Sequence, residues 1–326
     1  MMKKQTKKAI DLREYVPING IEQFLYHLGT KEENPVLLFL HGGPGSAESL
    51  FAHLYEEQWT KIFTLVHWDQ RGAGKTLTRN PDKLPTIELM LQDLNEVIQY
   101  LKKKYHKQKI VLLGHSWGSV FGSAFVQKHP EDIAYYIGTG QVINMTENEQ
   151  VGYGRVRELI TRAGDRRSLK KLEAIGVYPG EKISFDQAFL KKINRVRKLQ
   201  TKYGLSGDAF LPILNEARKS PIFRLSDCSA FLKIYKANQG VYPFLCNFNL
   251  WEEPREYRVP VYYVLGGDDW QAPYTIAEKY FEEISAPRKK KYVIPDARHL
   301  AMVDQPELFF QALSGIQNLE QKAGNS

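Results

Sequence analysis

The residues with the clearest chemical meaning are Gly-His-Ser-Trp-Gly at positions 114–118, which fit the pattern G-x-S-x-G. In enzymes with this pattern the serine lies on a sharp turn between a strand and a helix, with its hydroxyl exposed. The context agrees, because the apolar run Ile110–Leu113 precedes the turn and the helical pattern Val120–Lys128 follows it. Strand and helix pass close together there, so small residues are needed at both outer positions. The sequence therefore predicts Ser116 as a nucleophile that attacks a carbonyl carbon.

A serine hydroxyl is a weak nucleophile, so it needs a general base and a group that orients the base. The chain order expected with this turn is nucleophile, acid, histidine. Of the eight histidines, only His299 comes after the long middle segment described below. The acid is expected at the end of the preceding strand, where Asp268 and Asp269 both stand; we choose Asp269 and keep Asp268 as the alternative. The acid fixes the tautomer of the imidazole and stabilises the imidazolium.

A second glycine-rich segment, His-Gly-Gly-Pro-Gly at positions 41–45, directly follows the apolar run Val36–Leu40. Such a loop exposes backbone N–H groups that can stabilise the negative charge of a tetrahedral intermediate. We expect one donor from Gly43 and the other from Trp117, the residue after the nucleophile. Together these groups predict hydrolysis through an acyl-enzyme.

The elements that must position these residues alternate between strands and helices. Such alternation is typical of an α/β fold, in which helices cover both faces of a parallel sheet. The predicted strands are Val36–Leu40, Phe63–Val66, Ile110–Leu113, Tyr135–Gly138, Val261–Leu265 and Lys291–Ile294, and the main predicted helices are a long one from Thr86, Val120–Lys128, Ile276–Ile284 and Pro306–Leu319.

The middle of the chain lacks this alternation and reads as helical. We predict that residues 141–255, hereafter the cap segment, form a helical lid between a first core part, 1–140, and a second, 256–326. The cap segment holds 20 Lys and Arg against 12 Asp and Glu, so the net charge of +8 resides there. Its basic residues fall between Phe189, Ile193, Val196 and Leu199, which is typical of a solvated helix face.

Three stretches together resemble the proline iminopeptidase family of α/β hydrolases. They are HGGPG at 41–45, DQRGAGKT at 69–76 and GHSWGS at 114–119, which match the family patterns HGGPG, DQRGxGxS and GxSWGS. The family's G-x-x-D-x-x-x-P around its acid also matches Gly266 to Pro273, which favours Asp269. The resemblance implies an α/β-hydrolase fold: a mostly parallel central sheet, helices on both faces and an inserted helical lid. It further implies an aminopeptidase that releases an N-terminal residue, typically proline, from peptides without a metal ion.

The sequence departs from the family at two places. Thr76 stands where the second pattern has serine. The family's lid also presents acidic groups, often near tryptophans, to the free amino terminus of the substrate, whereas the cap segment is basic and holds one tryptophan, Trp251. An esterase, lactonase or other acyl hydrolase is therefore the alternative function. The acidic residues noted in the cap segment are Glu147, Glu149, Glu173 and Glu216.

Other classes of protein find little support. Gly74-Lys75-Thr76 resembles the end of a P-loop, but position 69, where that motif needs glycine, is aspartate. Cys228 and Cys246 are too few for a disulfide scaffold or a zinc cluster, so we expect free thiols and neither cofactor nor metal. The basic start at residues 1–8 has no apolar stretch after it, which predicts a cytoplasmic protein. We expect a small peptide or acyl substrate, with no nucleic acid or membrane as a partner.

Overall fold

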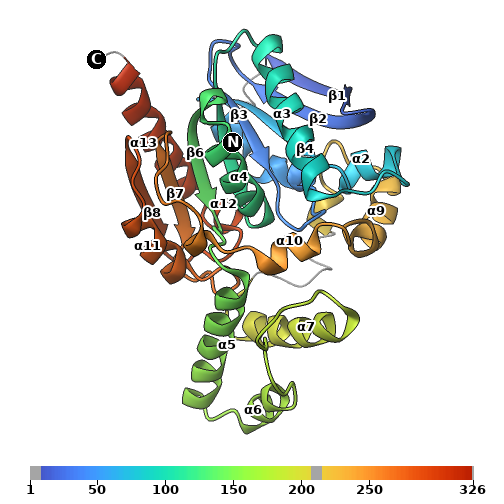
Figure 1. The fold of residues 1–326 in the computed structure, drawn as a ribbon, viewed down its shortest axis with the longest axis vertical. Helices are drawn as coiled ribbons and strands as arrows, with labels where there is room; N and C mark the ends of the chain where they lie inside the picture. Colours follow the sequence, from blue (N-terminus) through green and yellow to red (C-terminus); the bar gives the residue numbers. More distant parts are fainter. Residues whose placement is uncertain (1–8, 207–214, 325–326) are drawn as a thin grey trace, which may run out of the picture.

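The computed structural model describes residues 9–206 and 215–324. The basic start at residues 1–8, on which the predicted localisation rests, lies outside these ranges. The centre of the fold is an eight-stranded sheet in the order β1-β2-β4-β3-β5-β6-β7-β8 (Figure 1). The strands are β1 (Ile10–Ile18), β2 (Ile21–Gly29), β3 (Val36–Leu40), β4 (Thr64–Asp69), β5 (Ile110–His115), β6 (Ile133–Thr139), β7 (Val261–Gly266) and β8 (Lys289–Ile294).

Strands β3 to β8 run parallel, and β1 and β2 pair antiparallel at one edge. The predicted mostly parallel α/β sheet is thereby confirmed. The edge hairpin, whose turn is Asn19-Gly20, is not among the strands predicted from the sequence. Both turn residues have positive φ, 45° and 75°, as a two-residue hairpin turn of type I′ requires.

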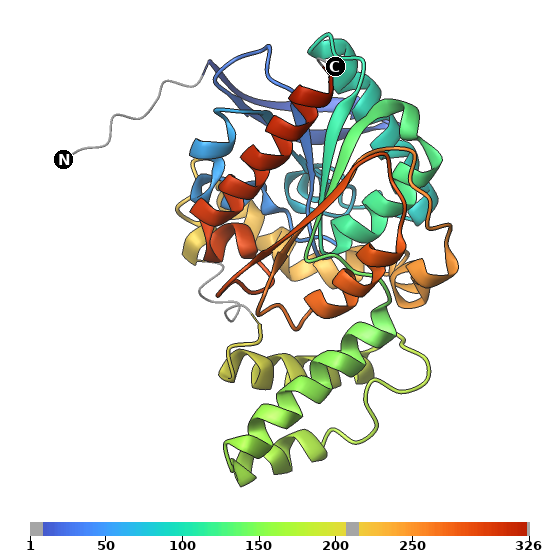
Figure 2. The same cartoon turned by 90° about the vertical axis from the view of Figure 1, so that its left-hand side faces the viewer.

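Helices cover both faces of the sheet and bury its apolar side chains in two large clusters. One cluster packs α3, α4 and α11 on one face, and the other packs η1, α1 and α13 on the opposite face. Figure 2 shows α13, in red, lying along its face. No described helix is both long and apolar enough to cross a bilayer. The helices outside the segment between β6 and β7 are η1 (Glu48–Leu54), α1 (Glu56–Trp59), α2 (Gly74–Arg79), α3 (Ile87–Lys104), α4 (Trp117–Lys128), η2 (Pro130–Asp132), α11 (Tyr274–Glu283), α12 (Ala301–Asp304) and α13 (Pro306–Gly324).

Between β6 and β7 the described part of the chain forms helices and no sheet strand. Helices α5, α6 and α7 extend away from the sheet and share a small apolar core of their own (Figures 1 and 2). Asn144 and Asn249 form an isolated β-bridge, which joins the start and the end of this segment, and α9 packs against α2 before the chain reaches Asn249. The helices are α5 (Met145–Arg162), α6 (Arg166–Glu173), α7 (Gln187–Lys202), α9 (Leu225–Ala237), α10 (Tyr242–Asn247) and η3 (Leu250–Glu252).

Candidate active site

Ser116 lies on a tight turn between β5 and α4. Its backbone angles are φ 52° and ψ −115°, a conformation that a non-glycine residue rarely adopts. A Cβ atom at Gly118 would lie 2.0 Å from the carbonyl oxygen of Leu40, and one at Gly114 would lie 2.5 Å from the carbonyl oxygen of Gly118. The turn is therefore so tight, and β3 passes so close to the start of α4, that only glycine fits two residues before and two residues after the serine.

His299 and Asp269 are in direct contact at the ends of two neighbouring strands. His299 Nδ1 lies 2.9 Å from Asp269 Oδ2. The other carboxylate oxygen of Asp269 accepts hydrogen bonds from the amides of Gln271, at 3.0 Å, and Ala272, at 2.9 Å. Asp269 is buried, whereas Asp268, the alternative acid, is exposed. Because Nδ1 is engaged by Asp269, Nε2 is the nitrogen of His299 left to exchange a proton.

The loop after β6 connects His299 with the nucleophile turn. The amide of Ser116 donates a hydrogen bond to the carbonyl oxygen of Thr139, at 3.1 Å. A Cβ atom at the next residue, Gly140, would lie 3.0 Å from Cε1 of His299. Although both residues are described, no hydrogen bond joins Ser116 Oγ to His299 in this structure. Such bonds often tighten only when substrate is bound.

The predicted donors for an oxyanion lie beside the serine. A Cβ atom at Gly42 would lie 3.3 Å from Cβ of Ser116, so the loop 41–45 packs against the nucleophile turn. Gly43 has φ +118°, which glycine adopts readily. Trp117 is the first residue of α4, and the first N–H groups of a helix have no acceptor within it. The structure thus packs the loop that holds Gly43 against the turn of Ser116 and Trp117, and the role of the two amides as oxyanion donors stays a prediction.

Gln70 links the loop at residues 41–45, hereafter the oxyanion loop, to the nucleophile turn at residues 114–118. Its backbone N–H donates to Nε2 of His41, at 3.2 Å, and its side-chain Oε1 accepts from the indole N–H of Trp117, at 3.1 Å. Because Nε2 of His41 is an acceptor, its Nδ1 carries the hydrogen and donates to the carbonyl oxygen of Gly42, at 2.8 Å. These contacts explain why the DQRG stretch accompanies the other two motifs.

Asp69 and Thr76 hold the ends of the DQRGAGKT stretch. Asp69 accepts from Ser49 Oγ, at 2.6 Å, and from the amide of Lys75, at 2.8 Å. Burial raises the pKa of the Asp69 carboxyl to about 6. The Thr76 hydroxyl donates to the carbonyl oxygen of Asp69, at 2.5 Å, and accepts from the amide of Phe24, at 2.8 Å. Threonine therefore supplies the same hydroxyl that serine supplies in the family pattern.

Sequence reasoning missed one buried pair in the site, Glu48 and His115. Glu48 Oε1 lies 2.5 Å from Nδ1 of His115, whose Nε2 lies 2.9 Å from the carbonyl oxygen of His299. Burial alone would lower the pKa of His115, but the Glu48 carboxylate, together with the carbonyl oxygen of His299 and the Asp269 carboxylate, outweighs burial and the pKa is raised. His115 was visible as the second residue of its motif, whereas nothing in the sequence marks Glu48.

The most buried of the cap glutamates is already paired. Glu149, on α5, accepts hydrogen bonds from the guanidinium of Arg197 and from the hydroxyl of Tyr178. Its charge is therefore balanced within the cap segment. The other three are Glu147, which accepts from Trp251 Nε1 at 2.7 Å, Glu216, which pairs with Lys219 at 2.6 Å, and Glu173, which is exposed.

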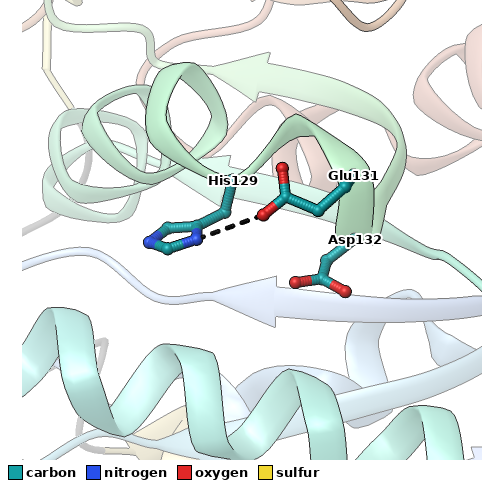
Figure 3. Close-up of side chains that lie close together, drawn as sticks. All are labelled: His129, Glu131 and Asp132. Carbon is teal, nitrogen blue, oxygen red and sulfur yellow. Dashed lines mark ion pairs between the residues drawn. The ribbon is translucent and has the colours of Figure 1, made fainter.

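One group of three potential metal ligands occurs among the described residues, far along α4 from the serine. Figure 3 shows His129, Glu131 and Asp132 at the C-terminal end of this helix, whereas Ser116 precedes its first residue. His129 pairs with Glu131 at 3.4 Å, and the carboxylate of Asp132 is bound by Lys102 and Gln99. Because Asp132 already has a cationic partner, we assign this group no metal-binding role.

Comparisons with known proteins concern the family and the fold. A family model described as "Serine aminopeptidase, S33" matches residues 31–201. The "Probable aminopeptidase YbaC" of Bacillus subtilis (strain 168) is 29% identical over 313 residues, or 94% of this chain and 96% of that protein. The crystal structure of a proline iminopeptidase from Mycobacterium smegmatis aligns with a TM-score of 0.70 at 20% identity, covering 96% of this chain and 100% of that one. A proline iminopeptidase-related protein of Thermus thermophilus gives 0.61 at 22% identity, covering 94% and 96%. The fold is therefore that of the α/β hydrolases.

Proposed function

The chain belongs to the S33 serine aminopeptidase family, and from this premise we propose that it releases proline or a similar residue from the amino terminus of peptides. The observation that carries the proposal is the arrangement at the ends of β5, β7 and β8. There Ser116 occupies a strained strand-to-helix turn, and Asp269 orients His299 through Nδ1. Acyl transfer by a serine requires a nucleophile and a base oriented in this way.

In the proposed mechanism, Ser116 Oγ attacks the carbonyl carbon of the first peptide bond while His299 Nε2 takes the hydroxyl proton. The amides of Gly43 and Trp117 bind the oxyanion that forms. The carbon–nitrogen bond then breaks as His299 returns the proton to the leaving amine. Water attacks the resulting ester through the same base, which frees the amino acid and restores the serine hydroxyl. Asp269 holds the imidazole and balances its positive charge.

The state of Glu149 favours a second candidate function. Recognition of a free amino terminus needs a carboxylate whose charge is available; the most buried cap glutamate, Glu149, is neutralised by Arg197, whereas Glu147 accepts from the neutral indole of Trp251. An esterase, lactonase or other acyl hydrolase would use Ser116 and His299 in the same way without binding an amine. We keep this function as the alternative.

A pair of substrates separates the two functions. Proline-β-naphthylamide and its N-acetyl form differ only in the free amine, and short acyl esters of p-nitrophenol serve as the third substrate. The proposed aminopeptidase should hydrolyse the free amine and reject the acetylated compound. Preference for the esters over both amides would replace the aminopeptidase by the acyl hydrolase. The Ser116→Ala variant is the control for background hydrolysis in each assay.

A further inference from the structure

Three separate loops must keep fixed positions if the site is to work. The oxyanion loop follows β3, the nucleophile turn follows β5, and the loop of His299 follows β8. The Glu48–His115 pair contacts all three. Glu48 Oε1 accepts from the amide of Gly42, at 3.3 Å, as well as facing His115. His115 adjoins Ser116 in the chain and bonds to the backbone of His299.

The chemistry of these partners fixes where the hydrogen of His115 lies. A backbone carbonyl oxygen can only accept, so Nε2 of His115 must donate to the carbonyl oxygen of His299. Nδ1 faces the carboxylate of Glu48, and the ring is therefore bound at both ends. The His115 and His299 rings lie with their centroids 4.9 Å apart. A ring held in this way cannot shift without displacing the base or the turn.

Stability gives only a weak reason to bury such a pair. Glu48 is 5% exposed and His115 2%, and removing two charges from water costs about as much as their attraction returns. A buried polar network does, however, select one arrangement of the segments that it joins. Here those segments carry the oxyanion donor, the nucleophile and the base.

We propose that Glu48 and His115 are positioning residues, which hold the oxyanion loop and the His299 loop in register with Ser116. This inference rests on the proposed acyl-transfer function, because register matters only if these groups act together. Neither residue touches the reacting atoms. Their effect should appear in kcat, since a displacement of about 1 Å in an active site can cost roughly 100-fold in rate.

The proposal is tested by two variants of His115, each of which keeps a donor near one of the two ring nitrogens. The amide nitrogen of asparagine lies near the position of Nδ1 of histidine, and that of glutamine lies near Nε2. Both His115→Asn and His115→Gln are made together with Glu48→Gln, so that neither leaves an unpaired carboxylate buried. The glutamine variant keeps a donor for the carbonyl oxygen of His299, and the asparagine variant loses it.

With the preferred chromogenic substrate, the asparagine variant should lose about 100-fold in kcat with little change in KM. The glutamine variant should recover most of that loss at a similar melting temperature. Equal kcat values in the two variants, whether high or low, would overturn the proposal. If the wild type neither turns over substrate nor reacts with a fluorophosphonate, the proposed function fails and takes this inference with it.

A measurement on the wild type keeps the test independent of how the variants fold. In protein labelled with 15N-histidine, Nε2 of His115 should carry a proton at pH 8, assigned by the loss of its signal in the glutamine variant. An unprotonated Nε2 at this position would rule out the bond to His299, and the proposal with it.

Discussion

Lys75 of α2 and Asp227 of α9 form a buried ion pair between the sheet region and the cap segment. Lys75 Nζ lies 2.8 Å from Oδ2 and 3.0 Å from Oδ1 of Asp227, and both side chains are less than a tenth exposed. Asp227 Oδ2 also accepts from the amide of Arg224, at 2.8 Å, which caps the start of α9. The Asp227 carboxylate thus caps the first turn of α9 and also attaches this helix to the core.

Replacing Lys75 with methionine should lower the free energy of unfolding by about 3–5 kcal/mol, because Asp227 is left as an unpaired buried charge. The double variant Lys75→Met/Asp227→Asn keeps the helix cap and removes that charge, so it should recover most of the loss. Urea unfolding of the two variants and the wild type measures the effect. A single variant within about 1 kcal/mol of the wild type would mean that the pair is screened by solvent.

The proposed triad predicts a graded loss of activity. Ser116→Ala and His299→Ala should each lower kcat by about 10⁴-fold or more, and Asp269→Asn by a comparable or smaller factor. Asp268→Asn is the matched control, because this neighbouring aspartate is exposed, and it should change kcat little. The assay is steady-state hydrolysis of an aminoacyl arylamide. High activity in His299→Ala would remove the base that we propose.

Gly118→Ala should destabilise the protein by more than about 3 kcal/mol, because the new methyl group overlaps the carbonyl oxygen of Leu40. Gly154→Ala provides the opposite control. Gly154 lies in α5 with no atom within 4 Å of an added Cβ, so alanine should raise stability by about 0.5–1 kcal/mol. Thermal melts of both variants give the comparison. Similar shifts for the two would contradict the close approach of β3 and α4.

Asp69 should make stability depend on pH. Its pKa is about 6 in the folded protein against an ordinary value of 3.8, so the folded state binds more protons between these values. The stabilising contribution of Asp69 to the free energy of unfolding is therefore fully present below about pH 4. It falls as pH rises through 6, by on the order of 3 kcal/mol in total.

Asp69→Asn should abolish this part of the pH dependence of the free energy of unfolding, whose slope between pH 4 and pH 7.5 is compared below. The measurement is the free energy of unfolding at pH 4 and pH 7.5 for the wild type and the variant. Asp82→Asn, which changes an exposed aspartate, should keep the slope of the wild type. Equal slopes in the wild type and Asp69→Asn would show that Asp69 ionises in the fold as it does in water.

Local sequence signals were sufficient where chemistry and conformation coincide in a few residues. Gly114 is required by a contact within the turn of Ser116, so the motif with its flanking apolar runs indicates the strand and the helix, although Gly118 is required by β3. The edge hairpin also had such a signal, because Asn19-Gly20 between apolar runs favours a type I′ turn, yet the hairpin was not predicted. The bounds predicted for the cap segment, 141–255, stay a prediction.

Contacts between distant segments could not be predicted in this way. Asp268 and Asp269 are adjacent in the chain, and the choice of Asp269 came from the family pattern, because only the turn after β7 decides which carboxylate faces His299. Glu48 meets His115 across 67 positions of sequence, through the packing of η1 beside β5. No periodicity or spacing encodes such a meeting, because it depends on how whole elements pack.

The bridge between Asn144 and Asn249 has a consequence for how such an enzyme acquires new substrates. Since the polypeptide departs and returns beside this bridge, the pairing of β6 with β7 does not depend on the length of the excursion between these residues. The excursion can therefore vary where it lies away from the sheet, whereas α9 must keep its packing on α2 and α7 its hydrogen bond from Gln200 to Trp270.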